Sequence, residues 1–312
     1  MKRILVCGAN GFIGNHLCRR LKAEGHHVKG IDYASWGHDC TDTADEFEWR
    51  DLRIPFGLKK GYDEVYQLAA QMGGMGYIGG DHDADIMHDS VLINANVADA
   101  CRVAGVGKVF FSSSACVYSS ATDCREGDVY PAEPDSDYGW EKVFSERLWQ
   151  AYHRQYGLEV RIARFHNIFG PSCQWNTGRE KAPAAICRKV AEASDGGTIE
   201  IWGHGRQTRS FLYIDECIDG VQRLMDSRCR EPLNIGSDVE ISITDLVMMV
   251  ADIAGKKLGI EHIPGPVGVH ARNSDNTLIQ RTLGWAPSQP LRAGMEKLYC
   301  WVEHEVLTAR GP

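Results

Sequence analysis

The sequence predicts an α/β fold, a doubly wound parallel sheet with a smaller C-terminal lobe. Two observations carry this prediction. Short apolar, β-prone runs alternate with segments of helical periodicity from residue 3 to about residue 165. After that point the alternation loosens, and loops rich in Gly, Pro and Arg follow. Because alternating strands and helices build βαβ units, we expect parallel strands covered by helices on both faces.

The elements of the first half follow from local patterns. The run Ile4–Val6 is apolar and bounded by glycine, so it predicts the first strand. Apolar residues then recur at helical spacing from Phe12 to Leu21 and predict a helix. Further strands are expected at 26–32, before Asp51, and at 63–70, 108–114 and 159–170, with helices around 90–105 and after Tyr138. We expect an NAD-binding domain at 1–165, rejoined by about 207–236, and a nucleotide-sugar lobe at 166–206 and 237–312.

Composition excludes several classes of protein. The 312 residues are 43% hydrophobic and 24% charged, as in ordinary globular proteins of about two lobes. The net charge of −8 argues against a nucleic-acid binder. An anionic substrate would therefore need a local basic cluster.

Cysteine use and apolar runs bear on location. The 11 cysteines form no C-x-x-C pair, and only about five apolar residues precede Gly8, too few for a signal peptide. No apolar run reaches the ~18 residues of a membrane span. We expect a cytoplasmic protein with reduced thiols and no membrane partner. The His- and Asp-rich stretch 79–89 lacks metal-ligand spacing, so we expect a loop leading into a helix and no metal.

A glycine motif, Gly8-Ala9-Asn10-Gly11-Phe12-Ile13-Gly14, separates the first strand from the first helix. Its glycines permit a tight turn and close approach of the backbone to a pyrophosphate, which the helix N-terminus attracts. Asp32 ends the second strand, where a carboxylate accepts hydrogen bonds from a ribose diol and favours NAD. The predicted Rossmann-like NAD site comprises Gly8, Gly11, Phe12, Ile13, Gly14 and Asp32, with Asp51 and Leu52 as expected adenine contacts.

Tyr138 and Lys142 lie four residues apart, on one face of a predicted helix. An ammonium beside a phenol lowers the phenol's pKa, so the pair could remove a proton from a substrate hydroxyl. Ser114 ends a predicted strand and could complete the hydrogen-bond relay. Cys116 should project to the same side as Ser114 if the strand alternation continues. Free cysteines usually pack in the core, so the thiol is of interest only if that side faces a ligand.

Together these motifs resemble the extended short-chain dehydrogenase/reductase family, whose members mostly act on nucleotide sugars. The blocks SSSACVY, YPAEPDSDYGWEK, GREKAPAAICRK and GHGRQTRSF extend the resemblance, over nearly the whole chain, to the GDP-mannose 3,5-epimerases within it. The resemblance implies a homodimer that uses NAD to convert GDP-D-mannose to GDP-L-galactose or GDP-L-gulose. Carbon 4 is oxidised transiently, protons exchange at carbons 3 and 5, and carbon 4 is reduced again.

The resemblance also implies individual roles. Ser114, Tyr138 and Lys142 carry the oxidation, with Tyr138 and Lys142 also contacting NAD. Cys116 and Lys181 are the two acid/base groups, because one base cannot reach both faces of a sugar ring. Cys116 then needs thiolate character, and Lys181 a pKa lowered by burial. The GDP-sugar site implied by resemblance is lined by Gly74, Met75, Ser114, Asn167, Glu180, Lys181, Lys189, Gln207, Arg209 and Arg272.

Other functions stay open on the sequence. A GDP-sugar 4-dehydrogenase or 4-epimerase would keep only the oxidation step. Segments 48–61 and 117–130 match the family loosely and border the sugar, so a related GDP-hexose or GDP-heptose is an alternative substrate. An inactive NAD-binding scaffold is the non-enzyme alternative, against which the intact set of five catalytic candidates argues.

Overall fold

The main body of the protein is a seven-stranded sheet in which all neighbouring strands are parallel. The computed structural model describes residues 1–35, 42–78, 80–119 and 123–310. The strand order is β12-β7-β5-β4-β1-β2-β3, so it reverses between β1 and β4, where open α/β sheets bind ligands. The strands are β1 (Arg3–Cys7), β2 (His27–Asp32), β3 (Glu46–Trp49), β4 (Glu64–Gln67), β5 (Lys108–Ser114), β7 (Val160–Phe165) and β12 (Leu233–Ile235).

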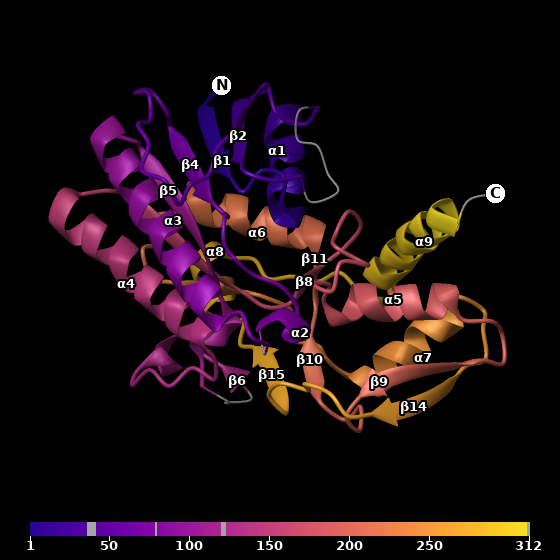
Figure 1. Cartoon of the computed structure of the whole chain (residues 1–312). Helices are drawn as coiled ribbons and strands as arrows, with labels where there is room; N and C mark the ends of the chain where they lie inside the picture. Colours follow the sequence, from indigo (N-terminus) through magenta and orange to yellow (C-terminus); the bar gives the residue numbers. More distant parts are fainter. Residues whose placement is uncertain (36–41, 79, 120–122, 311–312) are drawn as a thin grey trace.

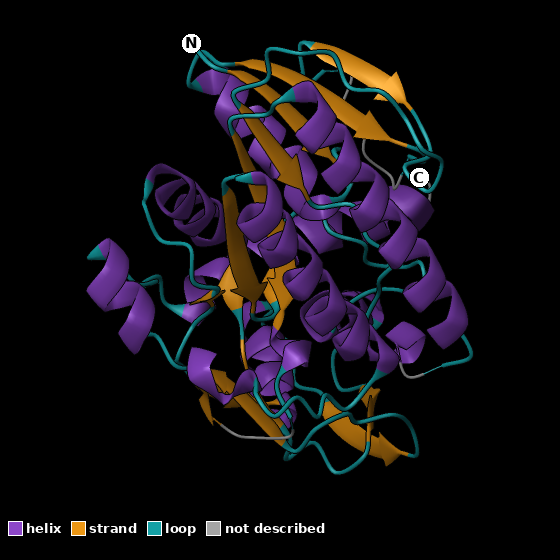
Figure 2. Ribbon diagram, turned by 90° about the vertical axis from the view of Figure 1, so that its left-hand side faces the viewer, coloured by secondary structure: helices purple, strands orange, loops and turns teal. Residues whose placement is uncertain are grey.

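Helices cover both faces of this sheet (Figure 1, Figure 2). Ile4 and Val6 of β1 join one core with α1 (Phe12–Ala23) and α6 (Ile214–Asp226). Leu5 and Cys7 point the other way and join a second core with α3 (Asp83–Ala104) and α4 (Asp137–Tyr156). A strand buried on both sides reads as a continuous apolar run, as this one does. The doubly wound α/β prediction is confirmed.

The C-terminal part of the chain gathers beside the carboxyl ends of these strands (Figure 1). Three helices pack together there, α5 (Ala182–Glu192), α7 (Ile243–Ile253) and α9 (Leu291–Arg310). Their apolar residues continue the core beneath α1 and α6. The short strands outside the large sheet are β6 (Asp123–Cys124), β8 (Ile168–Phe169), β9 (Thr198–Trp202), β10 (Thr208–Ser210), β11 (Leu212–Tyr213), β13 (Glu240–Ser242), β14 (Gly259–Ile263) and β15 (Ala271–Ser274). The remaining short helices are α2 (Met75–Ile78), α8 (Thr277–Leu283), η1 (Ala115–Val117) and η2 (Glu126–Val129).

Some expectations need correction in detail. The strand expected at 159–170 is broken between β7 and β8, because Asn167 adopts a positive φ of 43°. The helix expected around 90–105 begins earlier, at Asp83, within the His- and Asp-rich stretch; Gly79 of that stretch lies outside the described residues. Within 207–236, β12 is the edge strand of the large sheet and α6 packs on that sheet, whereas β10 pairs with β13 and β15. The two-domain division stays a prediction.

Candidate active site

A cleft of about 1280 Å³ opens at the carboxyl ends of β1, β4 and β5 and extends under the loops of the C-terminal part. It brings together segments from residue 8 to residue 272 of the chain. All the residues to which the sequence pointed line this cleft: Gly8, Gly11, Phe12, Ile13, Gly14, Asp32, Asp51, Leu52, Gly74, Met75, Ser114, Cys116, Tyr138, Lys142, Asn167, Glu180, Lys181, Lys189, Gln207, Arg209 and Arg272.

The glycine turn joins β1 to α1 with no room for side chains. Gly8 has a φ of 80°, and a Cβ there would lie 2.8 Å from the Ala69 backbone nitrogen. A Cβ on Gly14 would overlap the Gly8 carbonyl oxygen. The first N–H groups of α1 lack intrahelical partners, as at any helix start, so the turn presents donors to the cleft.

Two carboxylates lie at the end of the cleft formed by β2 and β3. Asp32 is 5% exposed and accepts hydrogen bonds from the backbone N–H groups of Asn10 (3.0 Å) and Tyr33 (2.8 Å). Asp51 is paired with Arg53, whose Nη2 lies 2.6 Å from Asp51 Oδ2, and this pairing lowers the Asp51 pKa. Arg53 also reaches Asp89 of α3 at 2.9 Å. No local motif in the sequence predicts this bridge by Arg53.

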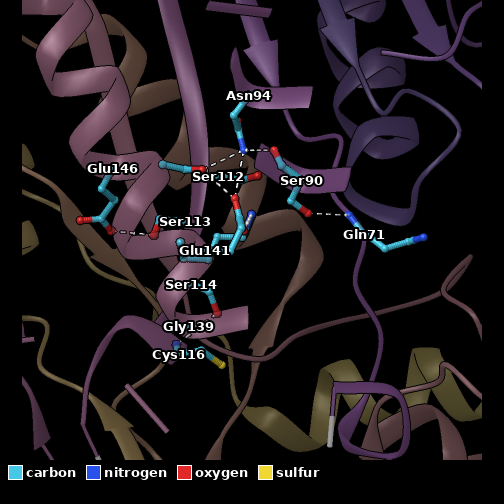
Figure 3. A network of polar contacts seen from close by, with 12 residues as sticks. Gln71, Ser90, Asn94, Ser112, Ser113, Ser114, Cys116, Gly139, Glu141 and Glu146 are labelled. Carbon is cyan, nitrogen blue, oxygen red and sulfur yellow. Dashed lines mark hydrogen bonds and ion pairs between the residues drawn. The ribbon is translucent and has the colours of Figure 1, made fainter. Parts of the chain in front are cut away.

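The Ser114–Cys116 segment differs from the expected strand. β5 ends at Ser114, and Cys116 lies in the 3-10 turn η1, so strand alternation does not relate the two side chains. Instead, the Cys116 N–H donates to Ser114 Oγ at 3.2 Å (Figure 3). The turn still places both residues in the cleft. A Cβ on Gly139 of α4 would overlap the Cys116 carbonyl oxygen, so the helix start can approach this turn only with glycine there.

Tyr138 and Lys142 lie on the first two turns of α4, which Ser136 caps by accepting from the Gly139 N–H at 3.2 Å. Lys142 Nζ lies 5.4 Å from the centre of the Tyr138 ring. The expectation of a lowered phenol pKa is wrong for the chain by itself. Burial raises the Tyr138 pKa well above its usual value, although a hydrogen bond with Ser114 opposes the shift. Lys142 is ion-paired instead with Glu141, 3.2 Å away.

Lys181 precedes α5 and approaches the cleft from the C-terminal part. Burial lowers the Lys181 pKa, and the charge of a Cys116 thiolate opposes that shift, which puts the two groups within electrostatic range. Arg272 of β15 donates to Cys116 Sγ at 3.6 Å and pairs with Asp135 Oδ2 at 2.7 Å. The thiol therefore lies near two cationic side chains, Lys181 and Arg272, that are far from it in the sequence.

Two further cations that line the cleft donate to backbone carbonyl groups. Lys189 Nζ donates to the Glu200 carbonyl at 2.6 Å, and Arg209 Nη2 donates to that of Val269 at 2.6 Å. A Cβ on Gly74 would overlap the Glu180 carbonyl oxygen, so the backbone before α2 lies tightly against the segment around Glu180. Among the described residues, Gln207 Oε1, Glu180 Oε2 and Arg272 Nε are buried and have no hydrogen-bond partner. Such atoms are costly unless a ligand satisfies them.

The profile of the NAD dependent epimerase/dehydratase family matches residues 4–236. The chain belongs to this family. It is 46% identical to GDP-mannose 3,5-epimerase of Arabidopsis thaliana over 97% of this chain and 83% of that protein. It is 30% identical to GDP-L-fucose synthase of Sinorhizobium fredii over 96% and 94% of the two chains. The solved structure of UDP-glucuronic acid 4-epimerase from Bacillus cereus in complex with NAD superposes with a TM-score of 0.82 at 26% identity, covering 97% and 99%.

The enzyme's N-terminal half fits the NAD of its family. Gly8, Gly11 and Gly14 line the cleft at the start of α1, where backbone N–H groups suit a pyrophosphate, and Asp32 lies at the end of β2. Among the described residues no group of three or more His, Cys, Asp or Glu side chains could hold a metal ion. In the same part of the chain, no helix is long and apolar enough to span a bilayer.

Sequence reasoning missed three charged residues of this enzyme's cleft region. Arg53 and Asp135 line the cleft, and Glu141 lies just behind it against Lys142. None belongs to a local motif with a known spacing, and each acquires its partner only through the fold. The pair Glu141–Lys142 was visible as neighbours in the sequence, but side chains one residue apart on a helix normally diverge.

Proposed function

We propose that the protein is a GDP-mannose 3,5-epimerase. The observation that carries the proposal is the convergence of Ser114, Tyr138 and Lys142 with Cys116 and Lys181 on one cleft. The first three suit removal of a proton from a sugar hydroxyl, and the last two suit proton exchange at neighbouring carbons. Relatives named GDP-mannose 3,5-epimerase, 45–46% identical over 97% of the chain, support the substrate.

The oxidising half of the reaction would proceed at Tyr138. When bound, NAD accepts a hydride from carbon 4 and later returns it, so the enzyme ends each cycle unchanged. Tyr138 takes the proton of the carbon 4 hydroxyl, and Ser114 holds that hydroxyl by a hydrogen bond. The phenol must ionise against the effect of burial, so the ammonium of Lys142, near its ring, has to stabilise the charge that develops.

The epimerising half would use the thiol and the amine. A ketone at carbon 4 acidifies the protons on carbons 3 and 5, because each carbanion delocalises as an enolate. Cys116 approaches from the β5 side of the cleft and Lys181 from the α5 side, so one can remove a proton and the other can supply one on the opposite face. The lowered pKa of Lys181 increases the share of neutral amine that can act as a base.

The diphosphate would lie among the cations of the C-terminal part. Arg209 and Arg272 are paired in register on β10 and β15, and both line the cleft. Guanidinium groups suit phosphate oxygens, and the unpartnered Arg272 Nε and Gln207 Oε1 offer further hydrogen bonds to a nucleotide. In this proposal Asn167, Glu180 and Lys189 line the nucleotide end, and Gly74 and Met75 the hexose end.

The deciding experiment incubates the enzyme with GDP-mannose in D₂O and follows the sugar by proton NMR and mass spectrometry. We expect deuterium at carbons 3 and 5 together with new hexose signals, and none of this with UDP-glucose. Inversion at carbon 4 without deuterium would instead establish a 4-epimerase, and accumulating NADH without epimer a 4-dehydrogenase. If the protein bound NAD but turned over no GDP-sugar, the inactive NAD-binding scaffold would be the remaining interpretation.

We further propose a cytoplasmic homodimer, with an NAD domain at 1–165 and about 207–236 and a sugar lobe at 166–206 and 237–312. Support for the dimer comes from α3 and α4, which lie side by side on the surface (Figure 1). Their outer side exposes Trp140 (44%), Phe144 (47%) and Val103 (66%), large apolar side chains that a second copy could cover.

A further inference from the structure

A buried polar network lies directly behind the catalytic helix. Asn94 of α3 is its centre: its Oδ1 accepts from Gln67 Nε2 (3.1 Å) and Trp149 Nε1 (3.2 Å). Its Nδ2 donates to Ser145 Oγ (3.1 Å) and to Glu141 Oε1 (3.2 Å) (Figure 3). Asn94, Glu141 and Ser145 are completely buried, so this network is a built feature of the core rather than a surface contact.

The two oxygens of Glu141 have different surroundings. Oε1 accepts from Ser145 Oγ of the same helix at 2.6 Å and from Asn94 of α3 at 3.2 Å, so it is held from two sides. Oε2 faces the Lys142 ammonium at 3.2 Å, and no described group gives it a well-aligned hydrogen bond. A buried carboxylate with one oxygen clamped and the other turned to an ammonium can hold that ammonium in place.

Lys142 itself has little other support in the described part of the chain. Its side chain is 1% exposed, and its Nζ lies over the faces of Phe111 (5.3 Å) and Tyr138 (5.4 Å). Aromatic faces attract a cation but do not fix its direction as a charged hydrogen-bond partner does. The position of the ammonium relative to the Tyr138 ring therefore depends on Glu141.

We propose that Glu141, clamped by Asn94 and Ser145, is a positioning residue that holds the Lys142 ammonium beside Tyr138 and toward the cofactor. This inference rests on the proposed function and on the contact between Lys142 and NAD that the family resemblance implies. It extends the catalytic set to a residue that touches neither substrate nor cofactor. The opposite arrangement, in which Glu141 competes with the cofactor for Lys142, predicts the reverse effect on cofactor affinity.

The test is a double-mutant cycle on the full chain freed of copurified nucleotide. Glu141→Gln, Lys142→Met and the double variant are compared with wild type in their Kd for NAD⁺, measured by calorimetry. We expect each single variant to raise Kd about tenfold, because either change removes the buried ion pair between Glu141 and Lys142, and the double variant to add little more. Glu146→Gln is the matched control: it is equally buried on α4 but pairs with Arg164, and its Kd should stay within about twofold of wild type.

Several outcomes would overturn the proposal. These are additive losses in the double variant, an unchanged Kd in either single variant, tighter NAD⁺ binding by Glu141→Gln, or an equal loss in Glu146→Gln. If Glu141→Gln does not fold, Ser145→Ala releases the Oε1 clamp while keeping the charge, and should raise Kd about twofold to threefold. Wild-type turnover of GDP-mannose, measured in parallel, tests the proposed function separately from the NAD⁺ affinities.

Discussion

At the scale of single residues, the proposed mechanism makes Cys116 the group that distinguishes epimerisation from oxidation alone. Cys116→Ala should lower the rate of deuterium incorporation at carbons 3 and 5 by at least the ~10²–10⁴-fold expected of a general acid/base. Oxidation at carbon 4 should persist, because Ser114, Tyr138 and Lys142 remain. The measurement is absorbance at 340 nm alongside mass spectrometry of the sugar. If Cys116→Ala incorporated deuterium at the wild-type rate, the thiol would have only a packing role.

Lys181 should show the complementary behaviour. Lys181→Met should remove proton exchange while leaving oxidation, and it should also change the pH dependence of stability. Burial lowers the folded-state pKa, so the charged amine destabilises the fold below its unfolded pKa and this penalty disappears as pH rises. The variant should therefore unfold at a higher temperature than wild type at pH 7, with a difference that shrinks toward pH 10. A constant difference across this range would contradict the assignment.

His166 gives the cleanest pH dependence. It is completely buried behind the cleft, with Nε2 3.1 Å from Asn234 Oδ1, and burial lowers its pKa from 6.5 to about 4. Above pH 6.5 both folded and unfolded histidine are neutral. Between pH 6.5 and about 4 only the unfolded state takes up a proton on this histidine. The free energy of unfolding therefore decreases by about 3 kcal/mol in total as the pH is lowered through this range. Urea unfolding of wild type and His166→Gln at several pH values in this range measures this loss. If the free energy of unfolding fell equally with decreasing pH in both proteins, His166 would be excluded as its cause.

The residues that could be read from the sequence are those in local motifs. The glycine turn, Asp32 and the Tyr138–Lys142 pair follow from spacing, because each set lies within one turn, strand end or helix. The ion pairs of Arg53 with Asp89 and of Arg272 with Asp135 join segments 36 and 137 residues apart, and no local pattern encodes them. The direction of the Tyr138 pKa was also out of reach, because it depends on how completely the fold buries the phenol.

At the scale of elements, the start of α4 is the most constrained contact of the site. Gly139 lies against the Cys116 carbonyl, and Pro134 Cβ would be 2.6 Å from an added Cβ. Gly139→Ala should push the helix away from η1 and lower the oxidation rate about 10²-fold, because Tyr138 and Ser114 would separate. A control glycine is available at the other end of the same helix: Gly157 has open space around it, and Gly157→Asn should keep full activity. Full activity of Gly139→Ala would show that this contact does not position Tyr138.

The elements themselves were predictable in unequal measure. The strands and helices of the first half alternate regularly, and their apolar runs match buried strands on both faces. The turn at Cys116 was not predictable, since Ser-Ala-Cys-Val continues a β-prone run and only the approach of α4 explains why the strand ends at Ser114. The break at Asn167 likewise depends on its side chain, which donates to the Ser210 carbonyl at 2.9 Å.

At the scale of the whole molecule, the exposed apolar side of α3 and α4 predicts a dimer. Phe144→Asp should give a monomer by light scattering at micromolar concentration, because a charge in the centre of an apolar interface is costly to bury. Val239→Asp is the matched control, since Val239 is also exposed (59%) but lies outside these helices. A wild-type monomer, or a dimer that survives Phe144→Asp, would contradict this interface.

The cleft draws its residues from almost the whole length of the chain, from the glycine turn after β1 to Arg272 on β15. This spread has a consequence for synthesis on the ribosome. Tyr138, which we propose takes the proton of the sugar hydroxyl, emerges before Lys181 and before Arg209 and Arg272, which we propose bind the diphosphate. An unfinished chain can thus contain the glycine turn proposed to bind NAD but still lack the arginines proposed to bind a sugar nucleotide. A reactive ketone is then generated only by molecules that also carry the groups needed to process it.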